Sequence, residues 1–197
     1  MEEQIFFATD NLRIEGMLDT ASPTHGAVIT HPHPLYGGDM DNPVVIAVQR
    51  AYRRQGISTL RFNFRGVGAS EGCYDNGAGE RRDVNAALSF LSGRGVTTLD
   101  LAGYSFGAWV NAGTGGCFKR MIMVSPPVAF MSFDPTTPIP ALQLIVTGGR
   151  DEIAPPRMVS DYRDQWNRTA ALEVFPDADH FYAGHFKALE DTIAARV

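Results

Sequence analysis

Residues 99–112 have the sequence LDLAGYSFGAWVNA, in which a serine flanked by glycines follows a short apolar run. The apolar run predicts a strand, the glycines predict a sharp turn, and the residues after Gly107 predict a helix. Ser105 would stand at the tip of that turn, beside helix N–H groups that favour an anion. This placement suits nucleophilic attack, so Ser105 is the candidate nucleophile.

A second stretch, residues 68–72, matches the same five-residue pattern around Ser70. Turn-forming residues follow it, with the sequence CYDNG, and the strand before it has already ended at Arg65. Because the strand and helix that the motif needs are missing, we predict that Ser70 is a loop serine without a catalytic role.

A serine hydroxyl attacks efficiently when a base accepts its proton, and histidine is the usual base. The chain has five histidines, at His25, His31, His33, His180 and His185. His180 follows the last predicted strand in a loop, as a serine–acid–histidine order along the chain requires. We expect His185 on the surface of the closing helix, so His180 is the candidate base.

A carboxylate normally orients such a histidine, and several acidic residues precede or neighbour His180: Asp134, Asp151, Glu152, Asp177 and Asp179. Asp177 and Asp179 lie too near His180 in sequence to reach behind its ring easily. Asp134 lies in a proline-rich loop with no strand end to fix it. Asp151 directly follows a strong strand, with Glu152 as its close rival, so we predict Asp151 as the acid.

Acyl transfer also needs N–H donors for the oxyanion. The first should be the backbone N–H of Phe106, and the second should come from the loop after the strand at residues 26–31. Pro32 and Pro34 have no N–H, which leaves His33 or, alternatively, Leu35; we favour His33. His31 and His33 have no third ligand nearby, so we expect structural hydrogen bonds from them and no metal site.

The remaining pattern predicts the elements that position these residues. An antiparallel hairpin is expected at residues 4–8 and 12–18, and strands are expected at 26–31, 57–64, 120–124, 141–147 and 171–175, besides the strand before Ser105. Helices are expected after Ser105 and at about 43–55, 80–91, 155–166 and 185–197. Residues 80–83 should form a solvated first turn of the helix at 80–91. Alternating strands and helices predict an α/β fold, a doubly wound and mostly parallel sheet with helices on both faces, in one domain at 1–197.

The composition excludes several classes of protein. The 197 residues carry a net charge of -5 without a basic cluster, which argues against nucleic-acid binding. No apolar stretch approaches the ~20 residues that cross a bilayer, and the acidic start does not resemble a secretory signal. Two cysteines do not make a disulfide framework. We therefore expect a soluble cytoplasmic protein without a membrane partner; the sequence does not indicate an oligomeric state.

The chain resembles the α/β-hydrolase superfamily, and more narrowly its small bacterial serine hydrolases without a lid domain. The resemblance rests on the order Ser105, Asp151, His180 and on the segments GYSFG (103–107), HPHPLYGG (31–38), NFRGVG (63–68) and DNGAGE (75–80). It implies a cofactor-free acyl hydrolase with those three residues as nucleophile, acid and base. The usual His-Gly of the oxyanion loop is His-Pro here, at residues 31–32.

The resemblance also implies that no lid is present, since only residues 125–140 occupy its usual place. An open site of this kind suits small soluble esters, and the candidate pocket residues are Tyr36, Tyr104, Phe130, Met131 and Phe133. For the last three, ordinary packing under a loop is the alternative. A thioesterase or peptidase would use the same triad. A non-catalytic binding protein on the same fold and a metal-dependent hydrolase built on His31 and His33 are the further alternatives.

Overall fold

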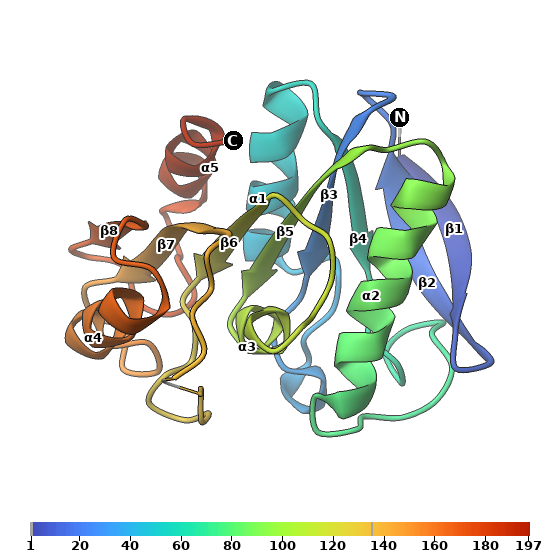
Figure 1. Ribbon diagram of the computed structural model, residues 1–197. Coiled ribbons are helices and arrows are strands. Elements are labelled where there is room, and N and C mark those ends of the chain that lie inside the picture. Colours follow the sequence, from blue (N-terminus) through green and yellow to red (C-terminus); the bar gives the residue numbers. More distant parts are fainter. Residues whose placement is uncertain (1, 135) are drawn as a thin grey trace.

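The structure, a computed structural model, describes residues 2–134 and 136–197. Within these residues eight strands form one sheet in the spatial order β1-β2-β4-β3-β5-β6-β7-β8 (Figure 1). The strands are β1 (Glu2–Thr9), β2 (Leu12–Asp19), β3 (His25–Thr30), β4 (Ser58–Phe62), β5 (Thr98–Tyr104), β6 (Arg120–Val124), β7 (Leu142–Gly148) and β8 (Ala171–Phe175). The helices are α1 (Pro43–Arg54), α2 (Ala78–Gly93), α3 (Phe106–Ala112), α4 (Pro156–Trp166) and α5 (Phe186–Ala194), with a short 3-10 helix, η1 (Pro34–Tyr36).

The sheet is mostly parallel. β1 pairs antiparallel with β2 and β2 pairs antiparallel with β4, whereas the neighbours from β4 across to β8 all run in parallel. The first hairpin closes tightly because Asp10 and Asn11 both adopt the positive φ, 48° and 65°, that a two-residue turn favours. These pairings confirm the predicted α/β class, the mostly parallel sheet and the opening hairpin.

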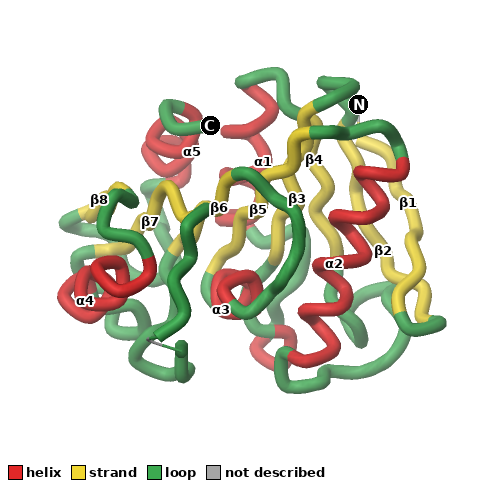
Figure 2. Tube along the Cα trace, viewed as in Figure 1, coloured by secondary structure: helices red, strands yellow, loops and turns green. Residues whose placement is uncertain are grey.

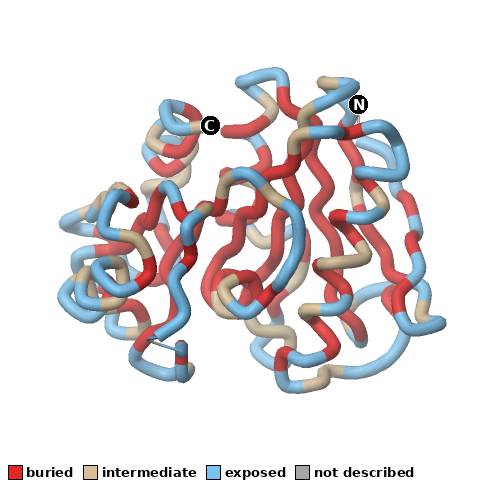
Figure 3. Tube along the Cα trace, in the orientation of Figure 1, coloured by how far each residue is buried: buried red, intermediate tan, exposed pale blue. Residues whose placement is uncertain are grey.

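Helices cover both faces of the sheet, as the sequence predicted. Figure 1 shows α2, α3 and α4 on the near face, where their apolar side chains join one core cluster, while those of α1 and α5 join a second cluster. Neighbouring residues of β5 serve opposite faces, since Leu101 belongs to the first cluster and Ala102 to the second. The central strands are accordingly buried along almost their whole length (Figure 3).

Local sequence signals determine where α1 begins. Asn42 precedes α1, and its Oδ1 accepts a hydrogen bond from the N–H of Val44 at 3.0 Å. Pro43 takes the first helical position, where its missing N–H costs nothing. The predicted start of this helix is therefore confirmed.

The prediction of a solvated first turn at residues 80–83 holds for Arg82, which is exposed, and is wrong for Glu80 and Asp83. α2 begins two residues earlier than predicted, and Glu80 and Asp83 are fully buried. Glu80 accepts a hydrogen bond from the N–H of Gly77 at 2.7 Å, and Asp83 pairs with the buried guanidinium of Arg65 at 2.7 Å. Both carboxylates therefore anchor the long loop between β4 and α2.

The loops that carry the predicted site residues leave the carboxyl ends of β3, β5, β7 and β8 and can be followed in Figure 2. In a parallel sheet these ends share one edge, which is where open α/β folds place their ligands. Among the described residues, no helix combines the length and the apolar character needed to cross a membrane.

Candidate active site

Ser105 stands between β5 and α3 in a strained backbone conformation, with φ 53° and ψ -119°. The crossing of strand and helix is so close that a Cβ atom on Gly107 would lie 2.5 Å from Oγ1 of Thr30. A Cβ on Gly103 would lie 2.6 Å from the same atom. A side chain at either glycine would therefore clash with Thr30. The turn presents the Ser105 side chain at the edge of the sheet.

His180 lies beside this serine. Its Nε2 atom is 3.0 Å from Oγ of Ser105, although the two residues are 75 positions apart in sequence. The loop after β8 carries the imidazole, and the hydroxyl of Tyr104 donates a hydrogen bond to the carbonyl oxygen of His180 at 2.9 Å. This bond ties the histidine backbone to the end of β5. The pair has the geometry of a nucleophile and its base.

Asp151 holds the far side of the imidazole. Nδ1 of His180 lies 3.0 Å and 2.9 Å from the two carboxylate oxygens of Asp151. Oδ1 also accepts the N–H groups of Ile153 and Ala154, while Oδ2 accepts the hydroxyl of Ser125 at 2.7 Å. Burial alone would raise the pKa of the Asp151 carboxyl, but the hydrogen bonds from His180, Ser125 and Ala154 hold that pKa below its ordinary value.

The rival carboxylates are occupied elsewhere. Asp134 bonds to Thr136 and Thr137 in its own loop, Asp177 pairs with Arg150, and Asp179 accepts the N–H of Phe181; these contacts lie outside the Ser105–His180 pair. The structure therefore brings together the three residues that the sequence singled out, Ser105, His180 and Asp151.

The loop after β3 contributes a shaped backbone. Leu35, one of the two candidate donors, gives its N–H to Nδ1 of His33 at 3.2 Å. Within the described chain, no acceptor is found for the N–H of His33 itself. Phe106 is the first residue of α3, where a helical N–H lacks an intrahelical partner. The N–H groups of Phe106 and His33 thus have no acceptor among the described residues, and both residues line a pocket with Ser105.

His31 has a structural part in this loop. Its Nδ1–H donates to the carbonyl oxygen of Pro32 at 2.7 Å, so its Nε2 is the atom that accepts the N–H of Phe64 at 3.0 Å. Complete burial lowers the pKa of His31 to about 4, which keeps the ring neutral. Both ring nitrogens are used by the backbone, as expected for a histidine that shapes the loop.

Two adjoining pockets open on Ser105. One, of about 260 Å³, is lined by Pro32, His33, Tyr36, Gly37, Gly38, Asn42, Tyr104, Ser105, Ile153, His180 and Phe181. The other, of about 440 Å³, is lined by His33, Tyr36, Ser105, Phe106, Pro127, Phe130, Met131 and Ile153. Apolar side chains dominate the larger pocket, and its size lies in the range of small-molecule sites.

Known structures share this architecture. An α/β serine hydrolase homologue from Coxiella burnetii is 34% identical, with a TM-score of 0.90 over 98% of this chain and 96% of that one. XC6422 from Xanthomonas campestris, a serine hydrolase without a lid, is 30% identical, with a TM-score of 0.89 over 98% and 92%. The chain belongs to the lidless α/β serine hydrolases. No family model matches the sequence.

A more distant relative shares the fold alone. Est1E from Butyrivibrio proteoclasticus, solved with ferulic acid bound, is 19% identical to this lidless serine hydrolase. Its TM-score is 0.81 over 97% of this chain and 96% of Est1E.

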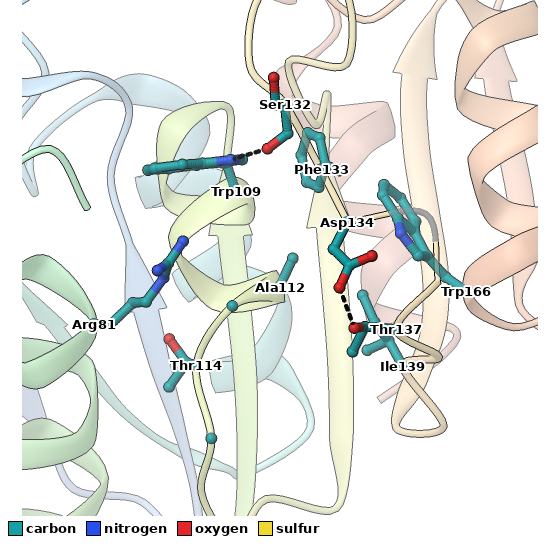
Figure 4. A pocket seen from close by; sticks show the side chains of 12 residues that line it. Arg81, Trp109, Ala112, Thr114, Ser132, Phe133, Asp134, Thr137, Ile139 and Trp166 are labelled. Atoms are coloured by element: carbon teal, nitrogen blue, oxygen red, sulfur yellow. Dashed lines mark hydrogen bonds between the residues drawn. The ribbon is translucent and has the colours of Figure 1, made fainter. Parts of the chain in front are cut away.

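In this lidless hydrolase, one expected pocket residue lies elsewhere. Tyr36, Tyr104, Phe130 and Met131 line the pockets at Ser105, but Phe133 does not. Phe133 is buried against Tyr162 and Trp166 and borders a separate hollow of about 440 Å³ between α3 and the loop that leads to β7 (Figure 4). Its ring is therefore part of the packing, which was the alternative for this residue.

The predicted site did not include two hydroxyl groups that lie near Asp151. Ser125 and Tyr182 lie at the site, and neither residue was predicted to have a role there. A signal was available for Ser125, because it directly follows the apolar strand β6 at the edge where the other loops converge. Ser70, in contrast, lies in a loop as predicted. Its hydroxyl donates to the carbonyl oxygen of Asn63 at 2.7 Å and accepts the N–H of Glu15 at 3.0 Å.

Proposed function

We propose that this lidless hydrolase cleaves carboxylic esters of small soluble substrates through Ser105, His180 and Asp151. The observation that carries the proposal is the unbroken series of contacts from Oγ of Ser105 to Nε2 of His180 and from Nδ1 of His180 to Asp151. All three side chains are buried to more than nine-tenths, yet Ser105 and His180 line an open pocket. A solvent-poor, polar series of this kind suits proton transfer during attack.

In the proposed reaction, Oγ of Ser105 attacks the ester carbonyl carbon while its proton passes to Nε2 of His180. The carbonyl electron pair moves onto oxygen, and the N–H groups of Phe106 and His33 stabilise the resulting oxyanion. The bond to the alcohol then breaks, and His180 gives its proton to the departing oxygen. Asp151 holds the imidazole in place and favours the imidazolium form while it exists.

The acyl group is then released by water. A water molecule gives a proton to Nε2 of His180 and attacks the acyl carbon, and the bond to Oγ of Ser105 breaks as that atom takes the proton back. The reaction needs no bound metal or organic cofactor.

The pockets support an acyl group with apolar character. Phe130 and Met131 line the larger pocket beside Ser105, so we propose that this pocket takes the acyl chain. Ferulic acid bound to Est1E is a carboxylic acid, the class of product that an ester hydrolase releases. Because residues 125–140 are too short to form a covering domain, we expect activity without a lipid surface.

Labelling with a fluorophosphonate probe tests the nucleophile. We expect the wild-type protein to be labelled, Ser105→Ala to be unlabelled, and Ser70→Ala to be labelled as the wild type is. A folded wild-type protein that resists the probe would contradict the proposal and favour a binding protein on this fold. Full activity in the presence of a metal chelator is also expected.

Matched substrates test the bond that is cleaved. An acetyl group presented as an oxygen ester, a thioester and an anilide should be hydrolysed fastest as the oxygen ester, and Ser105→Ala should reduce all three rates to background. Faster cleavage of the thioester or of the anilide would assign the protein to the corresponding alternative, a thioesterase or a peptidase.

A further inference from the structure

Strained residues gather around the catalytic acid. Six described residues other than glycine have a positive φ, and three of them, Asp10, Asn11 and Asn76, are of the types that tolerate it in turns. The other three are Ser105, Ser125 and Tyr182, at 53°, 45° and 55°. Such strain persists only where the surroundings enforce it, and it concentrates at functional sites.

The two strained residues besides Ser105 are joined to Asp151 and to each other. The hydroxyl of Ser125 lies 2.7 Å from Oδ2 of Asp151 and 2.9 Å from the hydroxyl of Tyr182. Ser125 and Tyr182 have no exposed surface. They come from different parts of the fold, since Ser125 follows β6 and Tyr182 follows β8.

The protons in this group have a single consistent arrangement. A serine hydroxyl has one proton, and the carboxylate of Asp151 can only accept, so Ser125 donates to Asp151. Ser125 must then accept the proton of Tyr182 at 2.9 Å. Burial raises the pKa of the Tyr182 hydroxyl, which keeps it a donor. The order of donation is Tyr182 to Ser125 to Asp151.

This order leaves Asp151 fixed from every side. Oδ1 accepts two backbone N–H groups at 2.9 and 2.7 Å, Oδ2 accepts Ser125, and Nδ1 of His180 lies within 3.0 Å of both oxygens. Without Ser125, Oδ2 would keep a single partner, and the carboxylate could rotate about the bond to its Cβ. The imidazole of His180 would then lose its fixed direction toward Ser105.

We propose that Ser125 and Tyr182 are positioning residues for the acid, acting on Ser105 only through Asp151 and His180. The inference rests on the proposed function of that triad. Tyr182 acts on Asp151 indirectly. Its hydroxyl donates to the hydroxyl of Ser125 and so keeps Ser125 in the orientation that donates to Asp151.

The experiment compares four variants by kcat, KM and the rate of fluorophosphonate labelling. Ser125→Ala and Ser125→Gly both remove the hydroxyl, but glycine also relieves the positive φ at this position. Tyr182→Phe removes only the second hydroxyl, and Ser125→Gly/Tyr182→Phe removes both. Ser70→Ala is the matched control, because it also deletes a buried serine hydroxyl with two hydrogen bonds, at 2.7 and 3.0 Å, away from the site.

We expect Ser125→Ala and Ser125→Gly to lower kcat by a similar factor, about 10- to 100-fold, with KM unchanged, as for loss of one hydrogen bond to a charged group. Tyr182→Phe should lower kcat less, by about 2- to 10-fold. The double variant should equal Ser125→Gly, because Tyr182 has no route to Asp151 once the serine hydroxyl is gone. Ser70→Ala should retain the wild-type kcat.

Two results would overturn the proposal. One is Ser125→Gly with wild-type kcat, which would leave only the backbone strain as the reason for the serine. The other is a double variant in which the two losses multiply, which would give Tyr182 an independent structural effect.

A substrate-free measurement separates this proposal from the function on which it rests. The Nδ1–H proton of His180, whose nitrogen lies within 3.0 Å of both carboxylate oxygens of Asp151, should be visible by proton NMR. Its resonance should shift in Ser125→Gly and not in Ser70→Ala. If the wild-type protein resists every ester and the probe while this shift occurs, the proposed function is wrong and the positioning network stands. If the wild type is labelled and the proton does not shift, the network is wrong and the function stands.

Discussion

Nε2 of His31 accepts a hydrogen bond from the backbone N–H of Phe64 at 3.0 Å, which joins the loop after β3 to the end of β4. The acceptor exists only while the ring is neutral, because a protonated ring would place an N–H against the N–H of Phe64. The buried ring is accordingly neutral in the folded protein down to a pKa of about 4.

Acidification should therefore destabilise the protein between about pH 6.5 and pH 4. In this window an unfolded chain protonates His31 and the folded chain does not, so the unfolded state gains stability as the pH falls. Below about pH 4 both states bind the proton and this loss is complete. The expected loss from His31 is ~3 kcal/mol, measured by urea unfolding at a series of pH values.

The variant His31→Gln isolates this effect. It should be less stable than the wild type at pH 7, and the difference between the two proteins should shrink on acidification toward pH 4. A difference that stays constant with pH would show that His31 titrates normally in the folded protein.

Glu80 should be required for the stability of the folded protein, because its carboxylate anchors the loop before α2. Its carboxylate accepts the N–H groups of Gly77 at 2.7 Å and Asp75 at 2.9 Å, and its side chain is fully buried. Glu80→Gln would turn an amide N–H₂ toward one of these donors. We expect the free energy of unfolding to fall by ~1–3 kcal/mol in urea titrations, against a change below ~0.5 kcal/mol for the exposed control Glu3→Gln. Equal effects of the two substitutions would contradict the buried anchor.

Substitution of Phe130 should change substrate preference, whereas substitution of Phe133 should change stability. Phe130 is 75% exposed and lines the pocket at Ser105, whereas Phe133 is 7% exposed and packs on Trp166. Phe130→Ala should raise KM for a butyryl ester more than for an acetyl ester and leave the melting temperature unchanged. Phe133→Ala should cost ~3–5 kcal/mol in stability and leave the butyryl-to-acetyl ratio unchanged. The reverse pattern would place the acyl group in the other hollow.

Gly107 should not tolerate a side chain. Its Cβ would lie 2.5 Å from Oγ1 of Thr30 and 2.8 Å from the carbonyl oxygen of His31, so β3 and its loop would have to shift. Gly107→Ala is expected to lower kcat by about 100-fold, because displacements near 1 Å at a reacting centre have effects of this size. Gly93→Ala is the control, since its Cβ would meet no atom within 4 Å. Normal activity in both variants would argue against the close crossing.

Most of the fold could be predicted because its signals are local. The start of α1 at Pro43, the turn at Asp10 and Asn11, and the strand before Ser105 each depend on a few adjacent residues. Glu80 and Asp83 were mistaken for solvated charges because their partners lie in a loop whose path the sequence does not specify. A charged residue is usually exposed, and only the tertiary contact with Arg65 reverses this expectation for Asp83.

The site was predictable to the extent that chain order and strand ends determine it. Ser105, Asp151 and His180 were predicted in this way, and the structure places their side chains in contact. Phe133 was misplaced because apolar character alone does not separate a pocket wall from a core. Ser125 and Tyr182 were missed because their proposed positioning role depends on side-chain contacts between loops that are distant in sequence.

The strained backbone at Ser105, Ser125 and Tyr182 has a consequence for engineering this enzyme. Glycine at Ser105 or Ser125, whose side chains are small, would release backbone strain and is a source of stability in a search for heat-resistant variants. Glycine at Tyr182 would instead destabilise the protein, because the fully buried ring would leave a cavity. The same two substitutions remove the proposed nucleophile or the hydroxyl that contacts the proposed acid, Asp151. Thermostability and turnover should therefore oppose each other at Ser105 and Ser125, whereas substitutions on the exposed surface of α4 could raise stability without a loss of turnover.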